Sequence, residues 1–202
     1  MKKSIASIVF LPFVLMSLSC GESDDIVDFS TGGSPNVILP LQVGNTWLYR
    51  RTSFDTEGFV LARDTVAQRI ARDTLIQDER WYIWEATSGL SLGTSRRDGY
   101  WTYVEGMPAI TLRYPVVVHE TYMITETGPT IHILAVDTLI GVPFGTAPCI
   151  AYEQLSFPGG TRMQIDYYAV NTGLIRTDEF VHTSSGADSL RHRWDLLELQ
   201  LH

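Results

Sequence analysis

Histidines and carboxylates could supply acid–base catalysis or metal ligands, but in this chain they are dispersed. The pairs His119–Glu120 and His192–Asp195 are the candidate metal ligands, and neither belongs to a ligand motif of recognisable spacing. The chain also lacks the His-Glu-x-x-His motif, the phosphate-binding loop and the dinucleotide-binding fingerprint. We therefore predict that the protein is not an enzyme and has no catalytic residue, no bound metal and no cofactor.

Aromatic residues are the other candidates for a site. The chain has nine tyrosines and five tryptophans. The tryptophans could line a groove for a sugar or a lipid, or they could fill the core of a curled sheet, because aromatic residues are common in strands and cores. The stretch Trp81-Tyr82-Ile83-Trp84 would present aromatic side chains to both faces of a strand, so both faces must be covered or one must bind something. The five tryptophans are Trp47, Trp81, Trp84, Trp101 and Trp194.

The first nineteen residues have the pattern of an export signal. Lys2 and Lys3 are followed by a mostly apolar run from Ile5 to Met16, which is too short to span a bilayer. The sequence Ser17-Leu18-Ser19-Cys20 then resembles the lipobox of bacterial lipoproteins, which implies that Cys20 receives a lipid and becomes the mature N-terminus. Ser17-x-Ser19 also suits ordinary signal peptidase, which would release a secreted protein instead.

Residues 20–36 are predicted to be an acidic, lipidated tether. They are small, polar and turn-forming, with too little apolar surface to fold alone. The acidic residues resemble the stretch that sends some lipoproteins to the outer face of the outer membrane, although a solvated linker would have the same composition. The predicted location is the bacterial outer membrane, on its periplasmic or cell-surface face.

Arginine is the only strongly basic residue of the predicted mature chain. Removal of residues 1–19 deletes both lysines and leaves 13 arginines against 23 acidic residues, a formal charge of −10. The arginines are scattered, so nucleic acid is excluded as a partner. The absence of lysine excludes Schiff-base catalysis and a lysine general base. The predicted partners are the membrane, through the lipid on Cys20, and an envelope protein, glycan or lipid.

Cys149 is the one cysteine left once Cys20 is lipidated. It lies between Pro148 and a strand-like segment, where a buried and inert thiol is the usual outcome. Its local sequence offers neither a histidine nor a helix N-terminus to activate it. An intramolecular disulfide would require Cys20 to remain free.

Strand signals dominate residues 37–202, which we predict to form a single β domain. Residues 163–170 alternate, with Met163, Ile165, Tyr167 and Ala169 on a core face and Gln164, Asp166 and Tyr168 opposite. The C-terminal third therefore predicts an antiparallel meander, and no segment has a helical apolar period. The expected fold is all-β and mostly antiparallel: a curved sheet, an open barrel or a sandwich, with little helix. Other strands are predicted at 46–54, 66–76, 81–87, 100–104, 131–140, 150–156, 174–183 and near the C-terminus.

The segment Pro40-Leu-Gln-Val-Gly-Asn-Thr-Trp-Leu-Tyr49 resembles the opening of a family of uncharacterised bacterial envelope lipoproteins. That family's Pro-Leu-x-x-Gly-Asn-x-Trp-x-Tyr strand is matched here, as are a Pro-x-Gly-Thr…Cys turn at 143–149 and a late Tyr-Tyr…Gly-Leu-Ile segment at 167–175. The resemblance implies an envelope location and β architecture and supplies no catalytic residue. In architecture alone, the chain also resembles periplasmic carriers that hold acyl chains in an open, curved sheet.

These observations favour a non-enzymatic outer-membrane lipoprotein with a binding or structural domain whose ligand is unknown. A carrier or chaperone for a lipophilic molecule is the first alternative, and a wide apolar cavity would favour it. A carbohydrate-active hydrolase is the second alternative, and two facing carboxylates in an aromatic cleft would favour it.

Overall fold

The computed structural model describes residues 37–87, 89–183 and 186–202. The predicted signal peptide (1–19), the predicted lipid-attachment residue Cys20 and the predicted tether (20–36) lie outside the described residues.

The described residues contain twelve strands and no helix, and all strands belong to one antiparallel sheet. The sheet order is β6-β5-β4-β3-β2-β1-β12-β11-β10-β9-β8-β7, so nearly every strand pairs with its neighbours in sequence. The edge strands β6 and β7 do not pair with each other. This confirms the all-β prediction, with an unclosed curved sheet as the form adopted. The strands are β1 Thr46–Phe54, β2 Val60–Ile76, β3 Glu79–Ala86, β4 Gly89–Arg96, β5 Gly99–Val104, β6 Met107–Arg113, β7 Thr121–Met123, β8 Thr130–Val142, β9 Gly145–Leu155, β10 Arg162–Ala169, β11 Gly173–His182 and β12 Asp188–Gln200.

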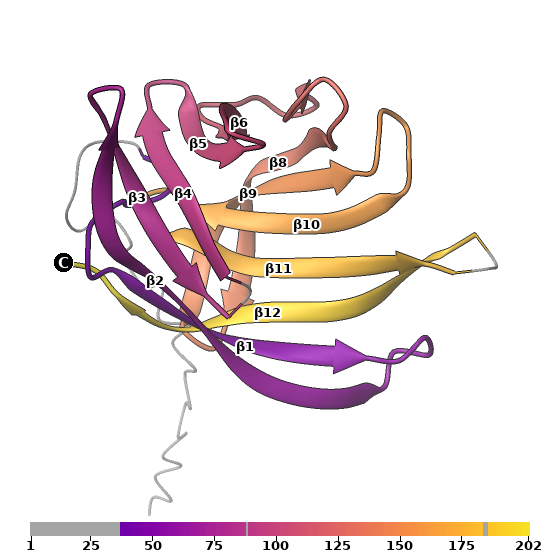
Figure 1. Ribbon diagram of the computed structural model, residues 1–202. Helices are drawn as coiled ribbons and strands as arrows, with labels where there is room; N and C mark the ends of the chain where they lie inside the picture. The colour runs from indigo at the N-terminus through magenta and orange to yellow at the C-terminus, as the bar shows by residue number, and fades with distance from the viewer. Residues whose placement is uncertain (1–36, 88, 184–185) are drawn as a thin grey trace, which may run out of the picture.

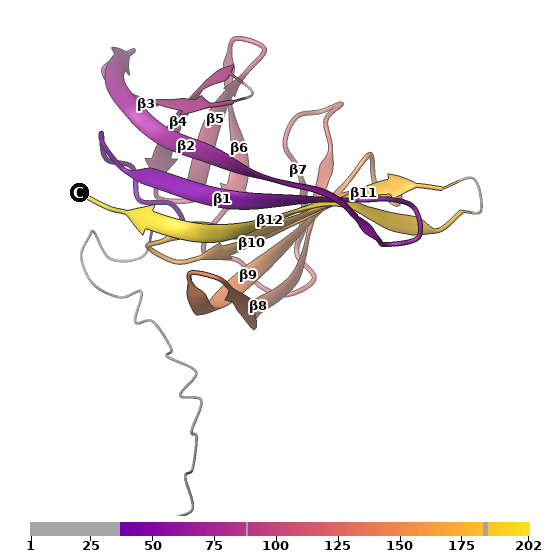
Figure 2. The same ribbon diagram turned by 90° about the horizontal axis from the view of Figure 1, so that it is seen from below.

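The long strand β2 divides the sheet into two arms. Its first part pairs with β1, from Val60 opposite Phe54 to Arg69 opposite Thr46. Its second part pairs with β3, from Gln68 opposite Ala86 to Ile76 opposite Glu79. Figures 1 and 2 show the consequence: β3, β4, β5 and β6 form one arm that turns away from the arm containing β1, β12, β11 and β10. The sheet is therefore curled, and side chains from both arms meet on its concave side.

Tyrosine hydroxyls satisfy backbone groups on the edge strand β6. The Tyr122 hydroxyl accepts a hydrogen bond from the Arg113 N–H at 3.1 Å and donates to the Thr111 carbonyl at 3.0 Å. The Tyr152 hydroxyl donates to the Arg113 carbonyl at 2.8 Å. An unpaired sheet edge can template aggregation. These contacts blunt that edge and hold the curled sheet together without strand pairing.

The Gly-Asn-x-Trp-x-Tyr segment forms a turn followed by β1, the strand expected from the sequence. Gly44 has φ of 99°, a conformation that favours glycine. Asn45 is buried; its side-chain amide donates to the Pro40 carbonyl at 3.0 Å, and its side-chain oxygen accepts from the His202 N–H at 2.9 Å. The turn thus ties the start of β1 to the C-terminal end of the chain.

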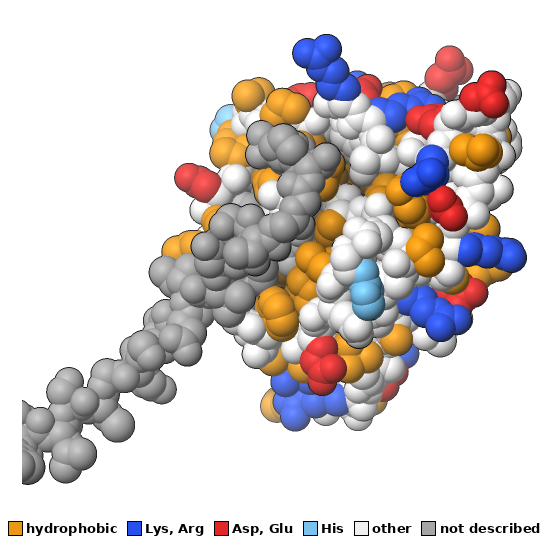
Figure 3. Space-filling model, turned by 90° about the vertical axis from the view of Figure 1, so that its left-hand side faces the viewer, with side chains coloured by type: hydrophobic (Ala, Val, Ile, Leu, Met, Phe, Trp, Pro, Cys, Tyr) orange, Lys and Arg blue, Asp and Glu red, His pale blue; other side chains and the backbone are white. Residues whose placement is uncertain are grey.

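On the face seen in Figure 3, arginine and acidic side chains are interspersed among exposed hydrophobic side chains. That face therefore carries no concentrated patch of one charge. No helix in the described part of the chain is long and apolar enough to cross a membrane.

Candidate functional site

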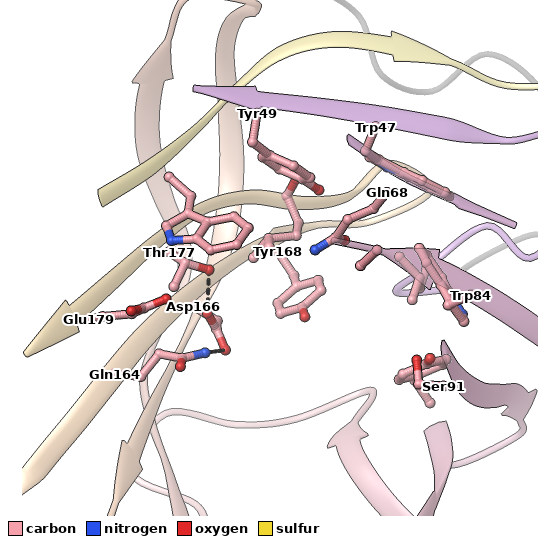
Figure 4. A pocket seen from close by; sticks show the side chains of 15 residues that line it. Trp47, Tyr49, Gln68, Trp84, Ser91, Gln164, Asp166, Tyr168, Thr177 and Glu179 are labelled. Carbon is pink, nitrogen blue, oxygen red and sulfur yellow. Dashed lines mark hydrogen bonds between the residues drawn. The ribbon is translucent and has the colours of Figure 1, made fainter. Parts of the chain in front are cut away.

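A pocket of about 310 Å³ lies where the two arms of the sheet face each other. Figure 4 shows β1 and β2 above it, β10 and β11 to one side and β3 and β4 to the other. Its volume is near the lower end of the range for small-molecule sites. The residues that line it are Leu39, Trp47, Tyr49, Gln68, Trp84, Ala86, Ser91, Tyr100, Gln164, Asp166, Tyr168, Leu174, Thr177, Glu179 and Trp194.

Hydrogen bonds and ring contacts fix the aromatic walls. The Trp47 indole donates to the Thr172 carbonyl at 2.8 Å, and the Tyr49 hydroxyl donates to the Leu174 carbonyl at 3.1 Å. The Trp47 ring lies 4.9 Å from the Trp84 ring and the Tyr49 ring lies 6.3 Å from the Trp194 ring, measured between centroids. Trp47 and Tyr49, two residues apart on β1, share one face of that strand. The walls are therefore held in place before any ligand arrives.

The polar end of the pocket comes from one face of the β10–β11 pair. Asp166 lies opposite Thr177, and Gln164 lies opposite Glu179. The Thr177 hydroxyl donates to Asp166 Oδ1 at 2.6 Å, and the Gln164 amide donates to Asp166 Oδ2 at 2.6 Å. The carboxyl groups of Asp166 and Glu179 stand diagonally across the two strands, which places their Cβ atoms about 7 Å apart. Figure 4 shows both pointing toward the same end of the pocket.

The pKa of Asp166 is raised to about 6 from the ordinary value of 3.8. Removal of the carboxyl group from water is the main cause, and the negative charges of Glu179 and Asp178 add to it. The hydrogen bonds from Thr177 and Gln164 favour the charged form and oppose the rise. Asp166 can therefore gain or lose a proton near neutral pH.

The carboxylates that are buried in the described residues, Glu153, Asp178 and Asp195, are each paired with arginine, whereas Asp166 is only partly buried. Asp178 binds Arg193 through both oxygens, at 2.6 and 2.8 Å. Glu153 accepts from Arg162 at 2.6 Å, and Asp195 accepts from Arg176 at 2.8 Å. Within the same part of the chain, Asp166 makes no ion pair. It is held by neutral donors, which leaves its charge without a direct counterion.

The candidate metal pairs from the sequence do not form a site. Glu120 pairs with Arg113 at 3.2 Å, whereas His119 stacks on His132 with 6.0 Å between ring centroids. His192 contacts Ser53 at 3.0 Å, and Asp195 is engaged by arginines. No group of three or more potential ligands gathers in the described ranges.

Cys149 is buried, as the sequence indicated, and its thiol donates to the Ala147 carbonyl at 3.5 Å. Burial raises the pKa of this thiol to about 12, so it stays protonated and unreactive at neutral pH.

The aromatic stretch 81–84 covers both faces of β3. Trp84 faces the pocket, and Tyr82 faces a second cavity of about 490 Å³ that borders Val37, the first described residue. Trp81 is packed against Tyr103 on the other face, at 4.9 Å between centroids. Trp47 and Trp84 fill both roles that the sequence left open, because they belong to the hydrophobic core and also line the pocket, together with Trp194.

The prediction of no catalytic residue overlooked one sequence motif, and the serine of that motif lines the pocket. Residues Gly89-Leu90-Ser91-Leu92-Gly93 match the Gly-x-Ser-x-Gly pattern of serine hydrolases, and Ser91 lines the pocket. In those enzymes the serine stands on a sharp turn between a strand and a helix. Here Ser91 lies within strand β4, paired opposite Trp84, and none of the pocket-lining residues is a histidine. The match therefore lacks both the turn and the base.

The fold and the site together define a curled, unclosed β-sheet with a pocket on its concave side. No protein-family model and no curated protein matches the chain. Among solved structures, the chain is similar to a Bacteroides fragilis protein described provisionally as exported, with a YmcC-like fold. The two are 10% identical with a TM-score of 0.50, and the similarity covers 82% of this chain and 100% of that chain.

A second similar structure, from Parabacteroides distasonis, is described provisionally as a lipoprotein. It is 13% identical with a TM-score of 0.44, and the similarity covers 83% of this chain and 100% of that one. At such low identity the Bacteroides fragilis structure shows the fold alone. The β architecture implied by the family resemblance is confirmed, while membership of that lipoprotein family stays a prediction.

Proposed function

We propose that this protein is a non-enzymatic lipoprotein of the bacterial outer membrane that binds a small molecule in the pocket between its two arms. The observation that carries the binding function is the preformed pocket of about 310 Å³, with fixed aromatic walls and convergent polar groups at one end. A purely structural β domain would gain stability by filling this space with side chains.

The location rests on the sequence. The export signal ending at Cys20 and the polar segment after it support lipid anchoring. The description of the Bacteroides fragilis structure as an exported protein agrees with export. Anchoring at the outer membrane would hold the pocket outside the cytoplasm.

A carrier for an acyl chain is less well supported. Asp166, Glu179, Gln164 and Gln68 line the pocket together with the aromatic residues. An apolar chain would desolvate these polar groups without hydrogen-bonding them, at a cost of about 1–3 kcal/mol for each neutral group and more for a carboxylate. The pocket thus favours a ligand that is itself polar.

One observation favours a second candidate, a carbohydrate-active hydrolase. Asp166 and Glu179 are two carboxyl groups in an aromatic pocket, and the raised pKa of Asp166 suits a general acid. However, both oxygens of Asp166 already accept hydrogen bonds within the protein, from Thr177 and Gln164. That arrangement holds the carboxyl group as an acceptor and does not direct its proton at a bound substrate, so binding is the better supported function.

Ligand-observed NMR on the full-length protein in a nonionic detergent tests the binding function. Small polar molecules are screened against the wild type and Ser91→Trp, which places a bulky ring into the pocket. Leu90→Trp is the matched control, because the neighbouring side chain points to the opposite face of β4 and is exposed. We expect binding that Ser91→Trp abolishes and Leu90→Trp retains; equal binding by both variants, or none by the wild type, would overturn the proposal.

Two further measurements separate the remaining parts of the proposal. Intact mass of the membrane-extracted protein, with Cys20→Ala as control, is expected to show lipid on Cys20; an unmodified Cys20 in a soluble fraction contradicts the anchor. Nitrophenyl glycosides test hydrolysis, and turnover that Asp166→Asn abolishes would establish the hydrolase instead.

A further inference from the structure

The pocket carries negative charge without an adjacent positive charge in its lining. Asp166 and Glu179 contribute two carboxyl groups, and none of the fifteen lining residues is arginine, lysine or histidine. The guanidinium of Arg51 lies over the Trp194 ring, 5.7 Å from its centroid, and is held by Asp64 through a 3.0 Å hydrogen bond. The negative charge of Glu179 also helps to raise the pKa of Arg51, so Arg51 partly balances Glu179 and not Asp166. An anionic ligand would therefore meet repulsion, whereas a cation would supply the countercharge that Asp166 lacks.

The aromatic walls suit the same kind of ligand. Tyr49 and Tyr168 line the pocket beside the carboxyl groups in Figure 4, and Trp194 lies opposite Thr177 on the neighbouring strand. Trp47 and Trp84 line the pocket farther along, where Tyr100 packs against Trp84. The faces of aromatic rings are electronegative and attract ammonium ions, most strongly where water is excluded. Aromatic rings together with carboxylates are the combination that binds organic ammonium groups, because the rings contact the methylene or methyl groups while the carboxylates balance the charge.

The end of the pocket away from the carboxyl groups is polar but uncharged. Figure 4 shows Ser91 and Trp84 at this end and Gln68 between the two ends. Trp84 is 8% exposed, and its indole nitrogen makes no hydrogen bond of good geometry. The indole lies close to the Tyr100 hydroxyl, where it opposes the rise in the pKa of Tyr100 that burial causes. A serine hydroxyl and a glutamine amide can each donate and accept, so this end fits a hydroxyl group.

We propose that the pocket binds a small organic ammonium ion that carries a hydroxyl group, an amino alcohol or an amino sugar, with the ammonium at Asp166 and Glu179 and the hydroxyl toward Ser91. This ligand class rests on the proposed binding function and specifies its chemistry. The ligand gives Asp166 an ion pair of the kind that the buried carboxylates Glu153, Asp178 and Asp195 already make with arginine.

Titration calorimetry with two matched probe pairs tests the charge requirement. Choline is compared with its neutral carbon isostere 3,3-dimethyl-1-butanol, and glucosamine with glucose, on the full-length protein in a nonionic detergent. Because the members of each pair differ in charge and little in shape, we expect at least one cation to bind ten-fold or more tightly than its neutral partner.

Variants locate the effect in the pocket. Asp166→Asn and Glu179→Gln are each expected to weaken cation binding at least ten-fold. Asp73→Asn removes the same charge from an exposed ion pair with Arg80 outside the pocket and is expected to leave binding unchanged. The ligand class is overturned if neither cation is preferred over its neutral partner, or if both pocket variants keep the preference.

The outcomes also separate the proposed ligand class from the proposed binding function on which it rests. Neutral probes that bind as well as the cations, and that Ser91→Trp excludes, would leave a small-molecule pocket with a different ligand class. If the wild type binds no probe, charged or neutral, in both the calorimetric and the NMR experiments, both proposals are overturned.

Discussion

Replacing Asp166 with asparagine removes a charge that the fold holds at a cost to its stability. The pKa of this carboxyl group is about 6 in the folded protein and 3.8 ordinarily. A difference of about 2 pKa units corresponds to about 3 kcal/mol of stability. Because folding raises this pKa, the folded protein binds the proton more tightly than the unfolded chain does. The charge therefore costs nothing below pH 3.8, costs progressively more between pH 3.8 and 6, and has its full cost above pH 6.

Asparagine has nearly the shape of the protonated side chain and can still accept a hydrogen bond from Thr177. We expect Asp166→Asn to be more stable than the wild type by about 1–3 kcal/mol at pH 8 and nearly equal to it at pH 4. Urea unfolding of both proteins at pH 4, 6 and 8, followed by tryptophan fluorescence, measures this difference. Since every other titrating group is common to both proteins, the difference isolates Asp166.

The buried carboxylate Asp178 provides the contrast. Asp178 binds Arg193 through both oxygens, so Asp178→Asn leaves a guanidinium without its partner. This variant is expected to be destabilised by about 2 kcal/mol or more at pH 8, opposite in sign to Asp166→Asn. If Asp166→Asn proves no more stable than the wild type at pH 8, or if its advantage is the same at pH 4, the reasoning on the uncompensated charge is wrong.

Three further predictions concern the sheet and the pocket walls. Tyr152→Phe removes the hydrogen bond to the Arg113 carbonyl and should cost about 1 kcal/mol in urea unfolding, with faster aggregation because the β6 edge is less protected; unchanged aggregation would argue against the edge role. Gly93→Ala places a methyl group against the Tyr100 hydroxyl and should cost about 1–3 kcal/mol, whereas Gly141→Ala, with only Thr146 at 3.6 Å, should be tolerated; equal thermal stability of the two variants would contradict this packing. Cys149, whose pKa is raised to about 12, should react with a thiol reagent at pH 8 only when urea unfolds the protein, so rapid labelling of the native protein would refute its burial.

The sequence predicted several strands well because their residues favour strands by themselves, although the longest strand, β2, begins at Val60 and was predicted to begin at 66. Strand β1 has the predicted bounds, and the meander from β9 to β12 is as expected. Strands β4, β6 and β7 were missed. The β4 sequence, Gly89–Arg96, has two glycines and two serines and no β-branched residue except Thr94, so its strand form depends on pairing with β3 and β5.

The pocket could not be predicted from the sequence, because it depends on register and curvature. The alternation in β10 was correct, and Ile165 and Ala169 are buried as expected, but Met163 on the same face is 44% exposed. The opposite face, with Gln164, Asp166 and Tyr168, lines the pocket and does not face open solvent. A flat sheet would have exposed that face; the second arm covers it. The one signal in the sequence was Asp166, which alternates with Gln164 and Tyr168 on one face of the predicted strand. That signal identifies a pocket only after β11 is known to lie beside β10.

The neutral side chains around Asp166 indicate that its negative charge is functional. Arginine is abundant in this chain and is the usual partner of a buried carboxylate here, as in the pairs made by Glu153, Asp178 and Asp195. Beside Asp166 the chain instead places Gln164 and Thr177, which hydrogen-bond the carboxyl group without fixing its charge. An arginine at either position would fill the negative end of the pocket with a permanent cation. Neutral donors keep the carboxyl group oriented and leave its charge free for the proposed ammonium ligand, which is the arrangement expected if stability has been given up for binding.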